Sequence, residues 1–242
     1  MKTLGIVGGI GPESTIEYYR LLIAGWRERR PDGTYPQLVI NSIDVSKVLA
    51  LAGKGQREDL AEYLLEALAQ LDRAGCDFAI LAANTPHIVF DEVAARSPLP
   101  LISIVQATCD FAKLHGLKKL GLFGTLSTMQ GGFYQTVSAK AGIEIIVPEI
   151  ADQKRVHEKY VGELVKGIFL PETRQRLLEI AARMKQRNKI DGLILGGTEL
   201  PLLLRDGSEL GIPLLDTTRI HVGAALEQWL VDSVSLLKPS VK

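Results

Sequence analysis

Three short apolar segments occur twice in this chain, in the same order and 113 to 116 residues apart. The pairs are Leu4–Gly8 with Leu120–Gly124, Asp77–Thr85 with Asp191–Glu199, and Leu99–Ser103 with Ile212–Asp216. Any two buried strands can resemble each other once, but three ordered matches at nearly one offset indicate a duplicated structural unit. The repeat therefore predicts two similar lobes, the first built from residues 1–98 and 212–242 and the second from residues 99–211.

Within each repeat, short runs of β-branched and Leu residues alternate with longer segments of helical periodicity. The clearest helix is expected over Gln56–Ala74, where leucines recur at three- and four-residue spacing. The predicted strands are Leu4–Gly8, Leu38–Ile43, Phe78–Ala83, Leu99–Ile104, Leu120–Gly124, Ile143–Val147, Leu193–Gly196 and Pro213–Asp216. Apolar strands between amphipathic helices are typical of parallel sheets covered on both faces. We expect an α/β fold of two pseudo-symmetric lobes, each a mostly parallel sheet flanked by helices, with a cleft between them.

The composition excludes several classes of protein. Hydrophobic residues make up 46% of the 242 residues, and 28 Lys and Arg balance 28 Asp and Glu. That apolar fraction excludes a disordered chain, and a net charge of zero argues against a nucleic-acid partner, whose phosphates require a basic excess. Nothing approaches the roughly 18 consecutive apolar residues of a membrane span. We expect a cytoplasmic protein that binds neither nucleic acid nor membranes.

The cysteine and histidine content predicts neither a disulfide framework nor a metal site. The two cysteines, Cys76 and Cys109, are interpreted as buried structural residues. The four histidines are scattered without the spacing of metal ligands, so no metal is expected.

Polar residues follow corresponding strands in the two repeats. Asn84 and Thr85 end one strand, and Thr198 and Glu199 end its counterpart. In open α/β sheets ligands bind beyond the carboxyl ends of the strands. If the lobes face each other, a small molecule between them meets similar groups on opposite sides. This arrangement suits a reaction that removes a proton from one face of a carbon and returns it to the other.

Motifs spread over nearly the whole chain resemble those of the aspartate/glutamate racemase family. They are Gly8–Pro12, Asn84 with Thr85, Gly124–Thr125 with Thr128, Gly197–Glu199 and Asp216–His221. Each motif is weak alone, and their order makes the resemblance specific. The resemblance implies a two-lobed α/β fold with its site in the cleft, no cofactor, and a homodimer. It also implies PLP-independent racemisation of acidic amino acids, with one cysteine as thiolate base and a second as thiol acid.

At the two positions that the resemblance assigns to these cysteines, the chain has Ala83 and Gly197. Neither residue can hold or give a proton, so the two-thiol mechanism is not available to this sequence. Cys76 precedes its strand and Cys109 lies in a helical stretch, so neither is expected to replace them. A general acid or base contributes about 10²–10⁴ in rate, so losing both should remove most of the catalysis.

The binding groups are independent of the missing thiols. Backbone amides at a helix start and neutral hydroxyls can hold carboxylates. The predicted substrate-binding residues are Gly9, Gly11, Asn84, Thr85, Thr125, Thr128 and Thr198. A dinucleotide site at the glycine loop is disfavoured because Ser14 stands where that motif needs glycine. The expected ligand is a small acidic amino acid or a dicarboxylate.

Three interpretations of the chemistry remain open. The protein can racemise with other groups, for which Glu199 and His87 are candidates because they lie close to the missing thiols. It can perform related carbanion chemistry, such as decarboxylation or another isomerisation. It can also bind a carboxylate without turning it over. Basic residues of a mobile lid, Lys154, Arg155 and Lys166, are further candidates for reaching an acidic substrate, and His221 is expected to tie the last strand to the following helix.

Overall fold

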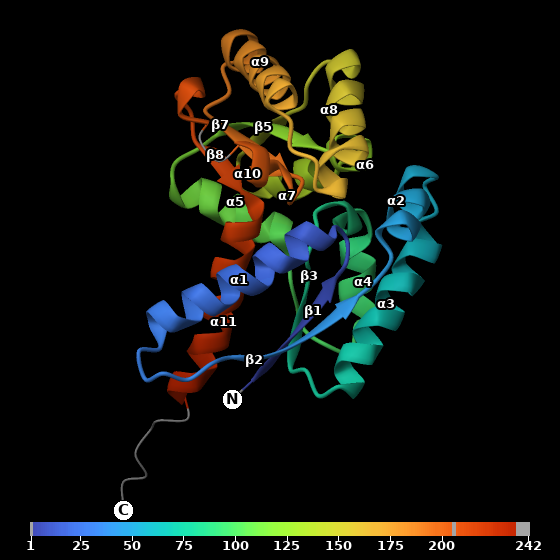
Figure 1. Ribbon diagram of the computed structural model, residues 1–242, viewed down its shortest axis with the longest axis vertical. Coiled ribbons are helices and arrows are strands. Elements are labelled where there is room, and N and C mark those ends of the chain that lie inside the picture. The colour runs from blue at the N-terminus through green and yellow to red at the C-terminus, as the bar shows by residue number, and fades with distance from the viewer. Residues whose placement is uncertain (1, 205–206, 236–242) are drawn as a thin grey trace, which may run out of the picture.

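The computed structural model describes residues 2–204 and 207–235, which contain two four-stranded sheets (Figure 1). The first has the order β2-β1-β3-β4, formed by β1 (Thr3–Gly8), β2 (Gln37–Ser42), β3 (Phe78–Leu81) and β4 (Leu101–Ile102). The second has the order β6-β5-β7-β8, formed by β5 (Lys119–Gly124), β6 (Glu144–Ile146), β7 (Gly192–Gly196) and β8 (Leu214–Asp216). All strand pairs are parallel, and equivalent strands take equivalent places. The α/β fold predicted from the internal repeat is confirmed.

Helices cover both faces of the first sheet (Figure 1). They are α1 (Pro12–Arg29), α2 (Val45–Gly53), α3 (Arg57–Arg73), the 3₁₀ turn η1 (Thr85–Val89), α4 (Phe90–Arg96) and α11 (Thr217–Ser235). The leucine stripe of α3 is buried in one core with Val7 and Leu81 of the sheet, as its spacing predicts. On the other face, α1 and α11 contribute Trp26 and Trp229, whose rings meet edge to face at 5.1 Å.

The second lobe has one continuous hydrophobic core around β5 and β7. Its helical segments are α5 (Ile104–Leu114), α6 (Leu126–Gln130), α7 (Phe133–Lys140), α8 (Ile150–Gly162), η2 (Leu164–Lys166), α9 (Pro171–Asn188), α10 (Leu200–Leu204) and η3 (Gly207–Leu210). The amphipathic helix α9 packs into this core through Leu177, Ile180 and Met184. The buried face of α9 therefore consists of the residues whose apolar spacing marks it in the sequence.

The chain passes between the lobes twice, and each passage lies one strand beyond the predicted boundary. Leu101–Ile102 was expected in the second lobe but pairs with β3 of the first sheet. Leu214–Asp216 was expected in the first lobe but pairs with β7 of the second sheet. In each repeat the last strand pairs with the sheet of that same repeat. The chain therefore crosses to the other lobe only after β4 and again after β8. Helix α11 then returns to the first lobe and lies against α1.

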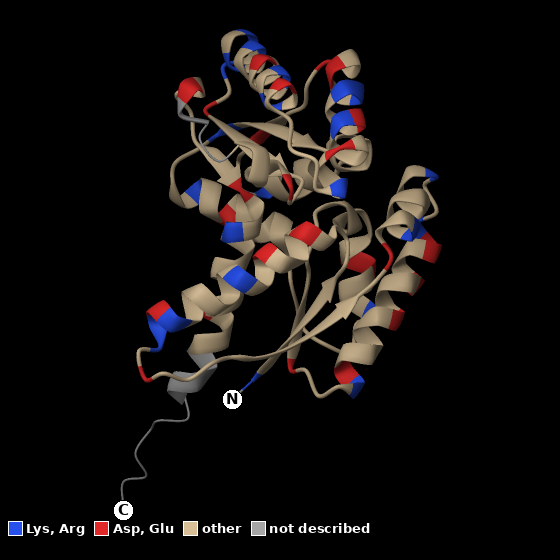
Figure 2. Ribbon diagram, viewed as in Figure 1, with Lys and Arg blue, Asp and Glu red and all other residues tan. Residues whose placement is uncertain are grey.

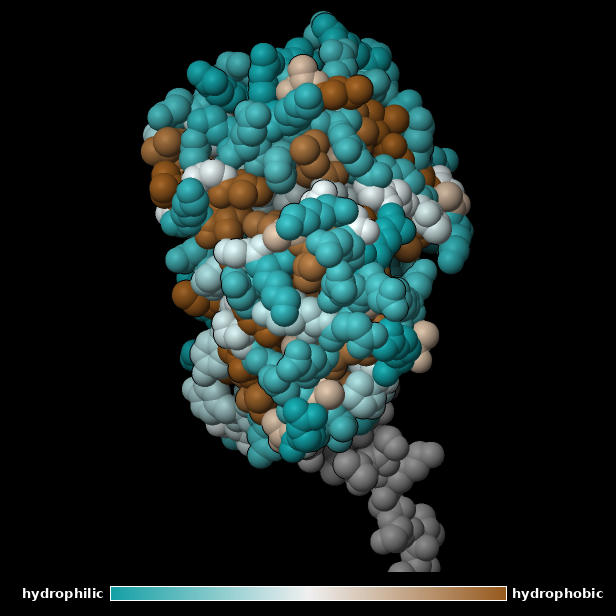
Figure 3. Space-filling view, turned by 90° about the vertical axis from the view of Figure 1, so that its right-hand side faces the viewer, coloured by the Kyte–Doolittle hydropathy of each residue, from teal (hydrophilic) through white to brown (hydrophobic). Residues whose placement is uncertain are grey.

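Charged side chains of both signs are scattered over the outer helices without a basic stripe (Figure 2). The face of the molecule seen in Figure 3 is mostly hydrophilic, with separate hydrophobic patches. Among the described residues, no helix is long and apolar enough to cross a membrane. The same residues contain no group of His, Cys, Asp and Glu side chains arranged to hold a metal ion.

Candidate functional site at the junction of the lobes

Residues from both lobes enclose one small cavity at the carboxyl ends of the central strands. Its volume is about 20 Å³, which is room for about one water molecule. The lining residues are Ile10, Gly11, Val45, Val48, Leu49, Ala83, Asn84, Thr85, Pro86, Tyr160, Val165 and Gly196. Ala83, which follows β3, and Gly196, which ends β7, therefore border the same space. Gly197, the residue that the repeat pairs with Ala83, is not in the lining and lies beside Tyr160.

Asn84 joins the lobes through its side-chain amide. Its Nδ2 donates to Thr217 Oγ1 at 3.1 Å, and its Oδ1 accepts from the Tyr134 hydroxyl at 2.6 Å. Thr217 in turn donates to the Leu195 carbonyl at 2.9 Å. All of these side chains are buried. Asn84 thus fixes the end of β3 against the end of β7.

Three threonine hydroxyls meet across the junction. Thr85 Oγ1 lies 3.1 Å from Thr125 Oγ1 and 3.2 Å from Thr128 Oγ1, and the last two are 3.0 Å apart. Thr125 also caps α6 by accepting the Thr128 amide at 3.1 Å. The sequence assigned all three residues to one site, and the fold brings them together because the ends of β3 and β5 converge. In this structure the hydroxyls bond one another, so a ligand must replace these contacts.

The glycine loop after β1 packs closely against the Glu199 side chain of the second lobe. Gly9 has a left-handed φ of 78°, and its amide donates to Thr15 Oγ1 at 2.9 Å. A Cβ on Gly11 would overlap Glu199 Oε1 and lie 3.0 Å from Glu199 Cδ. Only glycine at position 11 leaves room for the Glu199 side chain.

Glu199 is buried with neutral hydrogen-bond donors, and within residues 2–204 and 207–235 no cation is among its partners. Its Oε1 accepts from Ser14 Oγ at 2.7 Å, and its Oε2 accepts from the Tyr160 hydroxyl and from Thr198 Oγ1 at 3.3 Å. The side chain is 1% exposed. Burial raises the pKa of Glu199 because it disfavours the charged form, and the hydroxyl donors only partly oppose this effect.

Tyr160 of α8 fills the space beside Gly197. A Cβ at position 197 would lie 2.7 Å from Tyr160 Cζ and 3.0 Å from its hydroxyl oxygen, which is too close for a real contact. The ring lines the small cavity and its hydroxyl donates to Glu199. Sequence reasoning did not identify Tyr160. Two features of the sequence could have identified it. Tyr160 is an aromatic residue in a helix that is otherwise rich in charged residues, and Gly197 is smaller than the cysteine that the family resemblance predicts there.

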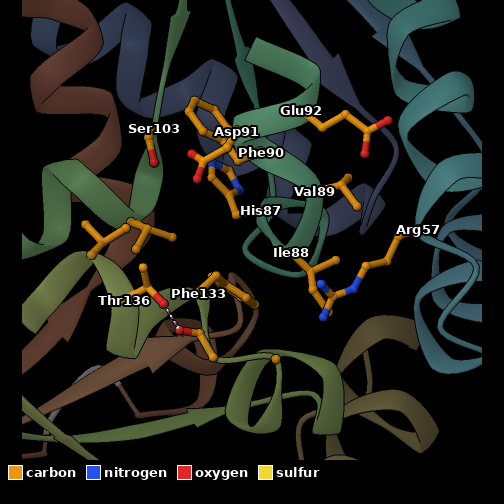
Figure 4. A pocket seen from close by; sticks show the side chains of 14 residues that line it. Arg57, His87, Ile88, Val89, Phe90, Asp91, Glu92, Ser103, Phe133 and Thr136 are labelled. Atoms are coloured by element: carbon orange, nitrogen blue, oxygen red, sulfur yellow. Dashed lines mark hydrogen bonds between the residues drawn. The ribbon is translucent and has the colours of Figure 1, made fainter. Parts of the chain in front are cut away.

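His87, the other candidate proton carrier, has both ring nitrogens engaged by backbone. Its Nδ1 donates to the Ala83 carbonyl at 3.0 Å, and its Nε2 accepts the Ile104 amide at 3.2 Å. Burial lowers the pKa of His87 to about 3, so the ring is neutral near pH 7. Figure 4 shows it with Phe90 and Asp91 on the wall of a different cavity, of about 370 Å³. This geometry gives His87 a structural role and does not place it in the small cavity.

His221 is engaged in the same way. Its Nε2 donates to the Ile102 carbonyl at 2.9 Å and its Nδ1 accepts from the Tyr18 hydroxyl at 2.8 Å. Burial lowers the pKa of His221 to about 4. The residue was expected to tie the last strand to the following helix, whereas it ties α11 to β4 and α1.

The cysteines and the basic residues of the proposed lid lie away from the small cavity. Cys76 is buried at the amino end of β3, and Cys109 is buried in α5, where burial raises the pKa of its thiol to about 12. Lys154, Arg155 and Lys166 are exposed on α8 and η2. The segment that carries them also supplies Tyr160 and Val165 to the cavity wall.

Comparison with known proteins gives one consistent result. A family model described as Asp/Glu/Hydantoin racemase matches residues 7–225. The broad specificity amino-acid racemase RacX of Bacillus subtilis is 25% identical, over 94% of this chain and 98% of its own length. A Yersinia pestis protein proposed to be an Asp/Glu racemase is 33% identical with a TM-score of 0.84, covering 95% of this chain and 100% of that one. Glutamate racemase of Francisella tularensis, solved with D-glutamate, shares the fold at 16% identity and a TM-score of 0.69, over 100% of this chain and 84% of that one.

Proposed function

The chain belongs to the Asp/Glu/hydantoin racemase family, and we propose that it binds a small acidic amino acid or a dicarboxylate in the cleft between its lobes. The observation that carries the proposal is the single cavity shared by Ala83, Asn84 and Thr85 of one lobe and Tyr160 and Gly196 of the other. Hydroxyl and amide donors surround it, which are groups that hold carboxylate oxygens.

Binding requires the lobes to move apart. Small-molecule pockets usually measure roughly 300–1,000 Å³, whereas this cavity measures about 20 Å³. Separation would free the Thr85 hydroxyl from those of Thr125 and Thr128, which lie together at the start of α6 in the second lobe, and expose all three to a ligand. In the part of the chain that the structure describes, no Lys or Arg lines the cavity. Recognition of a carboxylate would therefore depend on neutral donors and on backbone amides near Gly9 and Gly11.

The reaction we assign is cofactor-independent removal of the α-proton of such a ligand, the step with which the racemisation of the family begins, without PLP or a metal. We further propose that the protein is cytoplasmic and homodimeric and has no nucleic-acid partner. Ala83 and Gly197 supply no ionisable group, so proton transfer falls to other residues. Glu199 and the Tyr160 hydroxyl can carry a proton, whereas His87 lines the other cavity and burial keeps its ring neutral.

One observation favours a second function, a carboxylate-binding protein without turnover. Both positions that the family resemblance gives to cysteine have residues that cannot exchange a proton, and the Tyr160 ring occupies the space beside Gly197. Related carbanion chemistry, such as decarboxylation, stays a further alternative with the same binding site.

Calorimetric titration with L- and D-aspartate, L- and D-glutamate and succinate tests the proposal. Asparagine and glutamine, whose side chains are uncharged, are the comparison ligands. Binding of at least one acidic ligand is expected, together with a loss of affinity in Thr85→Val. The matched control is Thr136→Val, because Thr136 lines the wider cavity instead. Binding that depends on Thr136 and not on Thr85, or no binding of any acidic ligand, contradicts the proposed site.

A further inference from the structure

The two walls of the small cavity differ in their chemistry. The second lobe contributes Tyr160, whose hydroxyl donates to the buried Glu199 carboxylate. The first lobe presents the methyl group of Ala83, together with Asn84 and Thr85, whose polar atoms are already hydrogen-bonded. Among the lining residues, Tyr160 is the one with an ionisable side chain.

We propose that the Tyr160 hydroxyl, backed by Glu199, is the proton-transferring group of the cleft and that it acts on one face of the substrate. The protein would then exchange the α-proton of one enantiomer with solvent and keep its configuration. This inference rests on the proposed function, because it needs an acidic amino acid bound between the lobes.

The proposed step is a relay between two oxygens. As the Cα–H bond of the substrate breaks, its proton passes to Tyr160 Oη, and the hydroxyl proton of Tyr160 passes to Glu199 Oε2. The electron pair of the C–H bond stays on the substrate as the enolate of its α-carboxylate, stabilised by neutral donors such as the threonine hydroxyls. After the hydroxyl of Tyr160 and the carboxyl of Glu199 have both exchanged their protons with water, the reverse transfer delivers a solvent hydron from Tyr160 to the same face.

The surroundings of Glu199 suit the role of proton acceptor. Ser14 donates to Oε1 and fixes the carboxylate, which leaves Oε2 directed at Tyr160. No cation pairs with the carboxylate in the described structure, so the burial that raises the pKa of Glu199 also makes the ionised group a stronger base than an exposed one. Glu199 acts through Tyr160 and is therefore a positioning residue, whereas Tyr160 meets the ligand.

The asymmetry of the cleft sets the stereochemical outcome. Inversion needs a second proton carrier on the opposite face, and Ala83 cannot serve as one. His87 cannot replace it, because its two nitrogens are bonded to the Ala83 carbonyl and the Ile104 amide. One-sided exchange with retention is the result that this arrangement allows.

The test uses the full-length protein in D₂O with each enantiomer of aspartate and glutamate. Loss of the α-proton signal is followed by proton NMR, and chiral chromatography reports configuration. Tyr160→Phe keeps the ring beside Gly197 and should lower exchange at least about 100-fold, with ligand affinity in the same samples changed less than threefold. Glu199→Gln should lose exchange as well, and Glu199→Asp, which keeps a carboxylate, should retain a measurable part of it. Tyr19→Phe, on the exposed surface of α1, is the matched control.

The outcomes separate the inference from the proposed function. Exchange with retention that depends on Tyr160 supports the inference. Appearance of the opposite enantiomer, exchange that is unchanged in Tyr160→Phe, or ligand binding without any exchange overturns it and leaves the binding site standing. Absence of binding by every acidic ligand overturns the proposed function and the inference with it.

Discussion

Tyr160 lies in the space that a side chain at position 197 would occupy: a Cβ there would be 2.7 Å from Cζ of the tyrosine ring. The glycine and the tyrosine are therefore compatible as a pair, and a change at either residue has consequences for the other.

Restoring cysteine at positions 83 and 197 should require a change at Tyr160. Gly197→Cys alone is expected to lower the free energy of unfolding by about 1–3 kcal/mol, because overpacking displaces the ring. Adding Tyr160→Ala should recover part of this loss, measured by urea denaturation. The triple variant Ala83→Cys, Gly197→Cys and Tyr160→Ala is expected to racemise aspartate or glutamate. A folded triple variant that binds the ligand but does not racemise it would contradict the family-site assignment of these positions.

Exchange at the α-carbon should rise with pH. The relay needs ionised Glu199, whose pKa burial raises above 4.5. Tyr160 and the nearby Tyr18 stay protonated because burial raises the pKa of both well above 10.0.

The free energy of unfolding should change with pH in the opposite direction to the exchange rate. Since the folded state holds this proton more tightly, wild type loses stability relative to Glu199→Gln as pH rises from 4.5 through the folded-state pKa. Urea denaturation of both proteins at several pH values checks this prediction. If the difference in unfolding free energy between them does not change with pH, the folded state does not raise the pKa of Glu199.

Acid should destabilise the protein through its two buried histidines. The pKa of His87 is lowered to about 3 and that of His221 to about 4, against 6.5 for the unfolded chain. Their contribution is fully present above pH 6.5 and is lost as pH falls toward these folded values, at up to about 1.4 kcal/mol per pH unit for each histidine. His87→Gln should reduce this slope, and an unchanged slope would mean that His87 titrates normally.

Removing the Asn84 amide should weaken the contact between the lobes. Asn84→Ala leaves the Tyr134 hydroxyl without its acceptor and Thr217 without the amide donor, both in buried positions. An unsatisfied buried polar group costs about 1–3 kcal/mol, so the unfolding free energy should fall by at least that amount. Asn41→Ala, on β2, loses half-exposed contacts to α3 and should cost less. Equal losses in the two variants would argue against a special role for Asn84.

Much of this fold can be predicted from the sequence because a buried parallel strand is visible as a short run of consecutive apolar residues. The repeat of Leu4–Gly8 at Leu120–Gly124 marks the central strand of each sheet, and the leucine spacing of α3 marks its buried face. Thr85 follows a strand of the first sheet and Thr125 follows a strand of the second. Their meeting is therefore expected only together with the prediction that the two lobes face each other at the carboxyl ends of their strands.

Other features depend on tertiary contacts that no local pattern reports. Tyr160 reaches the cavity only because of the way α8 packs against β5 and the end of β7. The roles of His87 and His221 are set by backbone partners at Ile104 and Ile102, far from them in sequence. The lobe boundaries differ by one strand because a short segment such as Leu101–Ile102 can pair with either sheet as far as its residues show.

The two passages of the chain between the lobes are held together by His221, whose Nε2 bonds the Ile102 carbonyl across from the start of α11. Ile102 stands where the outward passage begins and Thr217 where the return begins, and the bond from His221 keeps the two connections next to each other. Two neighbouring connections can act as a double hinge, so we expect opening to be a rotation about one axis. Such a motion widens the mouth of the cleft most and leaves residues near the hinge almost fixed.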